Sequence, residues 1–236
     1  RARSGDTVIY YLPPPDPNWI HQPVADYYLG ELGVTVDLIE SLPDTPPQHF
    51  SDRLRTFAAG RSRFWVSWDQ QLPPARFASD ERERVLGSDF LLCAPLPGQQ
   101  RVDVRLYVPR PAEPPQPLFA FGAGVRLGLL EPPALAGDRL DILLWSSAAP
   151  DVPPYTYSVG LHIDDSSGAL AAQADYGLPA EASACHSTSI DIGSLPPGDY
   201  TVYLLVYAWE SGERLPGQVS SQQADRLPLY TFTHSG

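Results

Sequence analysis

The chain has 236 residues and a formal net charge of −12 at neutral pH. A surface this acidic lacks the positive field that attracts phosphate backbones, so nucleic acid and anionic membrane surfaces are excluded as expected partners. Hydrophobic residues make up 43% and aromatic residues 11%, which excludes global disorder and is enough for two domains with their own cores.

Up to about residue 109, apolar runs alternate with polar stretches of helical spacing. Strands are predicted at 6–12, 34–39, 63–68 and 101–108, and helix-compatible segments at 22–32, 51–58 and 73–87. This order predicts a small layered α/β domain with a largely parallel sheet over residues 1–109. The strict alternation of residues 101–108 favours an edge or half-exposed strand.

A proline-rich segment follows this first domain. Five prolines fall between Pro109 and Pro117. Each proline fixes its own φ and pushes the preceding residue toward an extended conformation. Residues 110–117 are therefore predicted to form an extended linker between two domains.

Residues 118–236 contain short apolar strands separated by polar turns, a pattern typical of an antiparallel β-sandwich. The expected core residues are Trp145, Val159, Leu161, Leu204 and Val206. 

The opposite face of the strand at 200–207 is unusually apolar, because it carries Tyr203, Leu205 and Tyr207. We expect this face to be covered by the first domain, by a segment such as 212–228, or by a partner chain. The three residues are candidates for an interface.

Two places in the first domain are candidates for ligand binding, because ligands of α/β sheets bind beyond the carboxyl ends of the strands. Asp16, Trp19 and His21 follow the first predicted strand, and Trp68 and Asp69 end the third. The structural alternatives, a proline-braced loop and an aspartate that caps the next helix, are favoured at both places.

No complete set of catalytic groups is recognised in the sequence. Phosphate-binding glycine loops, the GxSxG motif and Cys/His ligand clusters do not occur, so we expect no catalytic residue, cofactor or metal site. The acidic run at 164–168 favours a hairpin turn over a calcium loop.

The two cysteines, Cys93 and Cys185, lie in different predicted domains. They form either an interdomain disulfide or two separate buried thiols. Asparagine, cysteine and methionine are scarce and the loops are rich in proline, which suggests a thermophilic source. All 16 basic residues are arginine, which departs from the usual lysine-rich thermophile composition and suggests GC-rich coding. The chain starts at Arg1 without a signal peptide or an apolar run of spanning length, so we expect a processed product or an excised domain without a membrane span.

Several short motifs occur in a fixed order along nearly the whole chain. They are 5–10, 26–29, 61–69 and 104–107 before the proline segment, and 136–140, 195–202 and 212–216 after it. In this order the chain resembles the extracytoplasmic C-terminal region of bacterial polytopic glycosyltransferases of the protein-mannosyltransferase-like type. In that family the membrane-embedded part carries the catalytic acidic residues and the lipid-phosphate-sugar site, so the resemblance implies an accessory region.

These observations together favour a non-catalytic extracytoplasmic module of a cell-envelope protein, tethered to the membrane in its parent. Its expected role is binding or assembly, with glycan or acceptor chains as ligands and a membrane-embedded domain or another envelope protein as partner. Two alternatives stay open. One is a structural subunit of a surface assembly, and the other is a hydrolase or transferase that uses Asp16, His21 and Asp69.

Overall fold

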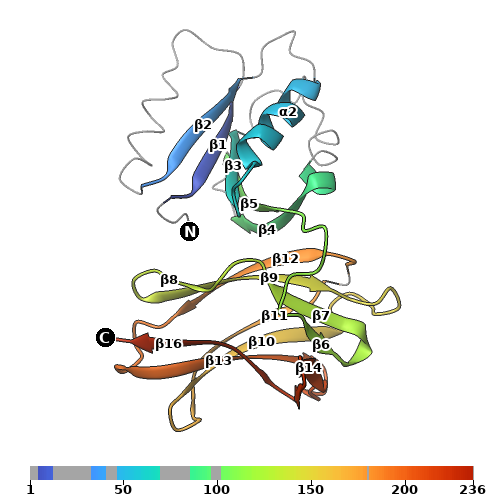
Figure 1. The fold of residues 1–236 in the computed structure, drawn as a ribbon, viewed down its shortest axis with the longest axis vertical. Helices are drawn as coiled ribbons and strands as arrows, with labels where there is room; N and C mark the ends of the chain where they lie inside the picture. The colour runs from blue at the N-terminus through green and yellow to red at the C-terminus, as the bar shows by residue number, and fades with distance from the viewer. Residues whose placement is uncertain are drawn as a thin grey trace. The chain divides into compact units, whose positions relative to one another are not determined.

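The computed structural model describes residues 5–12, 33–40, 47–69, 86–96, 102–179 and 181–235. The chain divides into two compact units, Arg1–Arg110 and Pro111–Gly236. Both are built mostly from β-strands, and antiparallel pairing predominates (Figure 1). A β-rich fold, expected from the sequence, is confirmed.

The described part of the first unit contains one five-stranded sheet, the helix α2 and a short helical segment at residues 86–89. Its elements are β1 (Thr7–Leu12), β2 (Thr35–Glu40), α2 (Pro47–Ala58), β3 (Phe64–Asp69), β4 (Phe90–Leu96) and β5 (Val102–Pro109). The strand order is β2-β1-β3-β5-β4. β1 pairs in parallel with β2 and β3, whereas β5 pairs antiparallel with β3 and β4. The sheet is therefore mixed rather than largely parallel.

The sheet is mixed because it contains β4, a strand that the sequence pattern does not predict. Phe90–Leu96 contains a proline and shows no regular alternation, yet it forms a hairpin-like pair with β5. β5 consequently lies inside the sheet, and Leu106, Tyr107 and Val108 are all buried. Of the two alternatives for this strand, the edge position is wrong, because its partner β4 is not recognisable from the sequence. The half-exposed alternative fits only Val104, Arg105 and Pro109, which are partly exposed.

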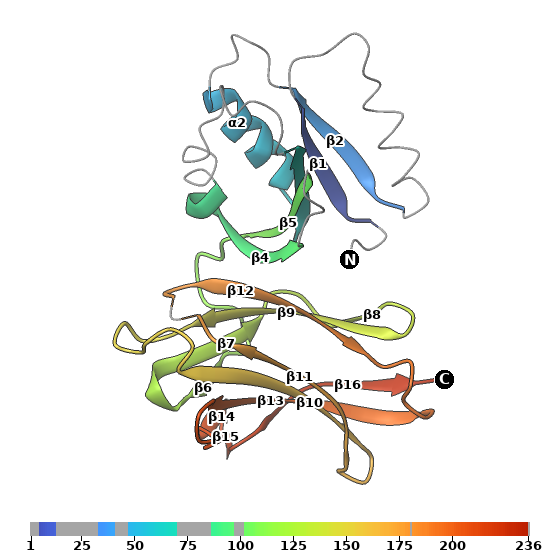
Figure 2. The same ribbon diagram turned by 180° about the vertical axis from the view of Figure 1, so that it is seen from behind.

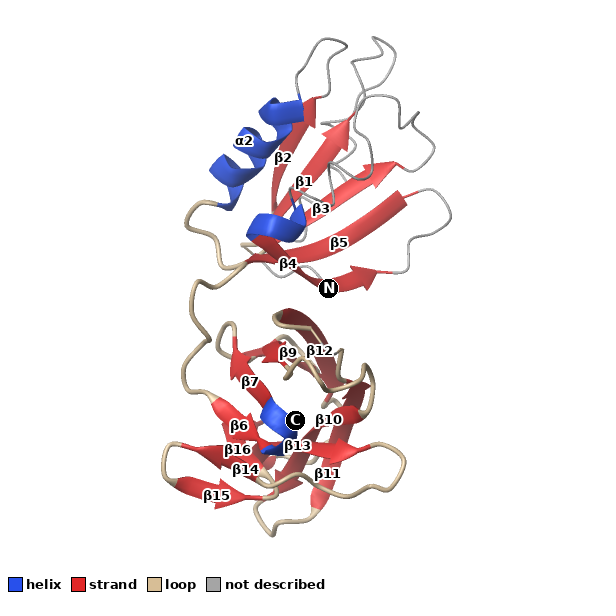
Figure 3. Ribbon diagram, turned by 90° about the vertical axis from the view of Figure 1, so that its right-hand side faces the viewer, coloured by secondary structure: helices blue, strands red, loops and turns tan. Residues whose placement is uncertain are grey.

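Helix α2 covers one face of this sheet (Figures 1 and 3). Leu54 and Ala58, which are one helical turn apart, pack with Ile9, Phe64 and Val66 in a single buried cluster. Gly60 follows with a φ of +74°, the left-handed conformation that commonly ends a helix. The helix predicted at 51–58 is confirmed and begins four residues earlier than expected.

A buried ion pair joins the residues that precede β1 and β3. Arg63 donates from Nε to Asp6 Oδ1 at 2.7 Å and from Nη2 to Asp6 Oδ2 at 2.8 Å. The indole of Trp65 donates to the same Oδ2 at 2.9 Å. Since the carboxylate is held by this two-pronged contact, the starts of the two parallel strands are fixed side by side.

The second unit consists of two sheets. Its elements are β6 (Phe119–Phe121), a 3-10 turn (Gly122–Gly124), β7 (Val125–Leu129), β8 (Ala134–Leu135), β9 (Arg139–Ser147), β10 (Tyr157–Asp165), β11 (Leu170–Gly177), β12 (Ala184–Asp191), β13 (Gly198–Ala208), β14 (Gly217–Val219), β15 (Gln222–Ala224) and β16 (Leu227–His234). The smaller sheet has the order β11-β10-β13-β16, and the larger runs β12-β9-β7-β6-β14-β15 with β8 paired to β9 (Figure 2). Residues 110–118, before β6, contain no helix or strand.

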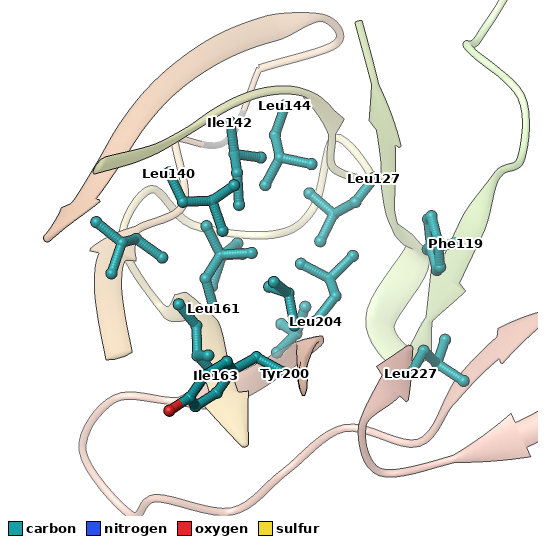
Figure 4. Close-up of a cluster of buried hydrophobic side chains, with 14 of the residues drawn as sticks. Phe119, Leu127, Leu140, Ile142, Leu144, Leu161, Ile163, Tyr200, Leu204 and Leu227 are labelled. Atoms are coloured by element: carbon teal, nitrogen blue, oxygen red, sulfur yellow. The ribbon is translucent and has the colours of Figure 1, made fainter. Parts of the chain in front are cut away.

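Alternate residues of both sheets meet in one core (Figure 4). The core residues include Leu140, Ile142 and Leu144 of β9, Val159, Leu161 and Ile163 of β10, and Val202, Leu204 and Val206 of β13. Each such side chain contributes roughly 1.5–3 kcal/mol when it is fully buried. The strand alternation read from the sequence thus identifies the core side of β10 and β13.

Trp145 departs from the expected core. It is buried, but it alternates with Leu144 and so belongs to the other face of β9. Its indole nitrogen donates to Ser183 Oγ at 2.7 Å, which satisfies the polar end of the ring.

The acidic run at 164–168 forms the turn between β10 and β11. Asp165 Oδ1 accepts from Ser167 N at 2.8 Å, from Ser167 Oγ at 2.6 Å and from Ala169 N at 3.0 Å, and Gly168 has a φ of +82°. The hairpin interpretation of this segment is confirmed, and its side-chain oxygen is occupied by the turn itself.

Candidate binding surface

The smaller sheet of the second unit has one face on the core, and we call the opposite side its outer face. The strand register places residues of β11, β10 and β13 side by side in rows across this face. Gly177, Ser158 and Tyr207 form the first row, Asp175, Gly160 and Leu205 the second, and Gln173, His162 and Tyr203 the third. The outer face is therefore a ladder of polar and aromatic side chains.

The carboxylate of Asp175 joins the first and third rows. Tyr207 Oη donates to Asp175 Oδ1 at 3.1 Å, and Gln173 Nε2 donates to Asp175 Oδ2 at 3.2 Å. The imidazole Nε2 of His162 lies 4.0 Å from Asp175 Oδ1, which is beyond hydrogen-bond distance. Gly160 gives Asp175 its space, because a Cβ there would lie 2.9 Å from Asp175 Oδ1.

An arginine lies over the far end of the ladder. Arg226 Nη1 donates to Asp164 Oδ2 at 2.6 Å, and its guanidinium carbon is 4.3 Å from the centre of the Tyr203 ring. Asp164 is only 2% exposed, so this charge is neutralised within the protein. Arg214, beside Tyr207, is likewise paired with Asp225 at 2.9 Å.

The titrating groups of the outer face are tuned by burial and by these neighbours. Burial is the main cause of a lowered pKa at His162. The nearby charges oppose one another: Asp175 and Asp164 raise this pKa, whereas Arg214 and Arg226 lower it. The lowered pKa favours the neutral imidazole, which donates from one nitrogen and accepts at the other. Burial, followed by the bond to Asp175, raises the pKa of Tyr207 and keeps its hydroxyl protonated.

Two strongly exposed aromatic side chains lie where this ladder ends. Tyr155 is 63% exposed and Trp209 is 62% exposed. Trp209 N donates to Thr156 O at 3.4 Å, so the two aromatic residues come from adjacent segments. The Tyr155 ring lies against Gly177, where an added Cβ would be 2.9 Å from Tyr155 Cδ1. Trp209 also continues the alternate series of Tyr203, Leu205 and Tyr207.

The candidate interface residues differ in their exposure. Leu205 is 2% exposed, whereas Tyr203 and Tyr207 are half-buried. Arg226 belongs to the segment 212–228 and lies over Tyr203, so this segment provides part of the cover expected for the face. That Tyr203, Leu205 and Tyr207 form an interface with another chain stays a prediction.

The candidates in the first unit are not brought together by the described part of the chain. Asp16, Trp19 and His21 lie outside the described residues. Trp68 and Asp69 form the end of β3, where the backbone pairs with β5, and their side chains lie outside the description.

The two cysteines belong to different units. Cys93 lies in β4 and Cys185 in β12; both are buried, and neither is a free thiol. Their pairing with each other stays a prediction.

His162 and Asp175 are absent from the sequence-based candidates. His162 is one of five scattered histidines, and Asp175 belongs to β11, whose run of alanines, glutamine and glycine shows little hydrophobic alternation. The one available signal was the turn at 164–168, since a hairpin there pairs the next residues with β10.

Comparisons with known proteins give no family. No family model matches the chain, and no curated protein matches it. Solved structures that show some similarity include a calcium-binding mutant of β-glucuronidase 2 from Bacteroides uniformis, with 15% identity and a TM-score of 0.27, covering 55% of this chain and 15% of that one. A β-glucuronidase from Bifidobacterium dentium has 14% identity and a TM-score of 0.26, covering 56% and 19%.

A third structure is an endonuclease/exonuclease/phosphatase from Beutenbergia cavernae, with 11% identity and a TM-score of 0.30, covering 82% of this chain and 61% of that one. At these scores the likenesses say nothing about activity. Separately, none of the helices in the described ranges has both the length and the apolar character needed to cross a membrane.

Proposed function

We propose that the chain is a non-catalytic binding module for glycans, and that the outer face of the smaller sheet in the second unit is its binding surface. The observation that carries this proposal is the pair of exposed aromatic side chains, Tyr155 and Trp209, beside the polar ladder of Tyr207, Asp175 and His162. Aromatic rings offer apolar faces to sugar rings, while the adjacent donors and acceptors are suited to hydroxyl groups.

The polar groups of this surface favour binding over chemistry. The carboxylate of Asp175 already accepts from Tyr207 and Gln173, and His162 is too far from it for a hydrogen bond. A base positioned by a carboxylate would need a distance near 3 Å. The arrangement presents fixed hydrogen-bonding groups on rigid strands, as a recognition surface requires.

The architecture proposed with this function is a small layered α/β unit followed by a β-sandwich. The shared core of the two sheets in the second unit and the contact of α2 with the first sheet support it. We further propose that the chain is the extracytoplasmic part of a cell-envelope protein, on the basis of the motifs that resemble protein-mannosyltransferase-like glycosyltransferases. The exposed aromatic pair favours the glycan-binding role over a structural subunit.

The proposal is tested with the full chain on immobilised polysaccharides of bacterial envelopes and on soluble oligosaccharides. The wild-type protein is expected to be retained by at least one of them. Trp209→Ala is expected to weaken the affinity for that glycan about tenfold or more, as for a central aromatic contact. Leu170→Ala, which removes another exposed apolar side chain at the turn end of β11, is the matched control and should leave retention unchanged. Equal retention of Trp209→Ala and the wild type would contradict the proposed surface.

A further inference from the structure

A hollow of about 420 Å³ lies beside the exposed aromatic pair, within the second unit. The residues around it include Ala123, Gly124, Asp151, Pro153, Thr156 and Tyr157. Its volume is in the range of small-ligand sites, and apart from Tyr157 its lining residues have short side chains.

The wall is held in an unusual backbone conformation. Ala123, which lines the hollow, has a φ of +55°, and Tyr155, which precedes the lining residue Thr156, has a φ of +61°, although neither is glycine. Gly124 is packed so closely that an added Cβ would lie 2.8 Å from the Cβ of Ala149. Non-glycine residues keep such conformations only where the surrounding structure enforces them, and they concentrate at ligand sites.

Asp151 is the acidic residue among those that line the hollow. No ion pair of Asp151 occurs among the described residues. The hydroxyl of Thr156 is already engaged, because it donates to Pro153 O at 2.9 Å. Arg214, a cation that follows the aromatic pair in the chain, is committed to Asp225 at 2.9 Å.

The hollow and the aromatic pair are connected through the backbone at Thr156, which lines the hollow and directly follows Tyr155 in the chain. Tyr157, which also lines the hollow, pairs with Ala208, and Trp209 N donates to Thr156 O at 3.4 Å.

We propose that this hollow is a subsite for a sugar unit that carries a protonated amino group, with Asp151 as the counter-ion, and that acidic sugars are rejected there. The inference rests on the proposed glycan-binding function. The charge of the protein supports it, because a net charge of −12 repels uronate and phosphate groups and attracts amines.

The test is titration calorimetry of the full chain at low salt and a pH at which sugar amines are protonated, with three oligosaccharides of equal length. They are a glucosamine oligomer, its N-acetylated form and a galacturonate oligomer. The wild type is expected to bind the amine form about fivefold more tightly than the acetylated form, as for a partly exposed ion pair. Binding of the galacturonate oligomer is expected to be the weakest of the three.

Asp151→Asn should abolish the preference for the amine without weakening the acetylated oligomer. Glu113→Gln removes the same charge from an exposed position in the linker region and should keep the preference. Two results would overturn the subsite alone. One is an amine preference that survives in Asp151→Asn, and the other is a wild type without amine preference that still binds the acetylated oligomer at Trp209. Failure of the wild type to bind any of the three, or any other glycan tested, overturns the proposed function as well.

Discussion

At the scale of single residues, a histidine and a tyrosine stack where β11 and β12 meet. The rings of His186 and Tyr176 are 3.5 Å apart and 9° from parallel. Burial lowers the pKa of His186 from 6.5 to about 4 and raises the pKa of Tyr176. The folded protein therefore holds His186 neutral at pH values where the unfolded chain protonates it.

The sign of the effect on stability follows from that difference. As the pH falls below 6.5 the unfolded chain takes up a proton first, so the free energy of unfolding decreases until the pH reaches about 4. At about 1.4 kcal/mol per pH unit, the loss amounts to about 3 kcal/mol. We predict that His186→Phe, which keeps the stacking, makes the stability of the second unit less sensitive to pH in this window. Urea unfolding at several pH values checks this, and an unchanged slope in the variant would contradict it.

The ion pair of Asp6 with Arg63 leads to a second prediction. Arg63→Met leaves the Asp6 carboxylate buried with only the Trp65 indole of the donors described above, and is expected to destabilise the first unit by about 3 kcal/mol. Arg53→Met removes an exposed arginine that lies over Phe57 and should change stability by at most about 0.5 kcal/mol. Equal unfolding midpoints for the two variants would show that the buried pair is not required.

At the scale of elements, one glycine permits β14 to pair with β6 against the core. A Cβ at Gly217 would lie 2.5 Å from Phe121 Cε1 and 3.0 Å from Leu227 Cδ1, and both neighbours are core residues. We predict that Gly217→Ala destabilises the second unit by roughly 1–3 kcal/mol through overpacking. Gly198→Ala is the control, because its nearest neighbour is 3.9 Å away, at Tyr200 Cε2. Calorimetric melting of both variants distinguishes them, and similar melting temperatures would be the contrary result.

The elements that the sequence predicts best are those with long apolar alternation. β9, β10 and β13 follow from it directly, because one face of each strand meets the core. β11 is missed because it contributes to that core mostly through Ala172, Ala174 and Tyr176, so that its hydrophobic signal is weak. β4 is missed because its proline and irregular pattern argue locally against a strand, a preference that pairing with β5 overrides.

The same distinction holds for the candidate site. The alternation of β13 identifies Tyr203 and Tyr207 on its outer side, and Trp209 is the next member of that series. The hydrogen bond between Tyr207 and Asp175 depends on how β10 pairs with both β11 and β13. The two residues are 32 positions apart in the chain, and no local sequence pattern determines this register. The hollow near Asp151 depends on backbone conformations that the sequence does not signal at Ala123 or Tyr155.

At the scale of the whole molecule, the cysteines provide a prediction about covalent structure. We expect Cys93 and Cys185 to be joined in protein prepared under oxidising conditions, which agrees with their burial and with the proposed extracytoplasmic location. Unfolded protein should then take up an alkylating label only after reduction, and the tryptic peptides of the two residues should be linked. Labelling of both thiols without reduction would exclude the bond and weaken the proposed location.

The central claim is that the outer face of the smaller sheet binds a glycan, and hydrogen–deuterium exchange tests it most directly. With a saturating concentration of an oligosaccharide that the wild-type protein binds, we predict slower amide exchange in three segments. They are the loop before β10, the turn after β13 and the strand β11, which carry Tyr155, Trp209 and Asp175. Amides of the first unit should exchange as they do without ligand. Protection confined to the first unit, or to strands of the larger sheet, would contradict the account.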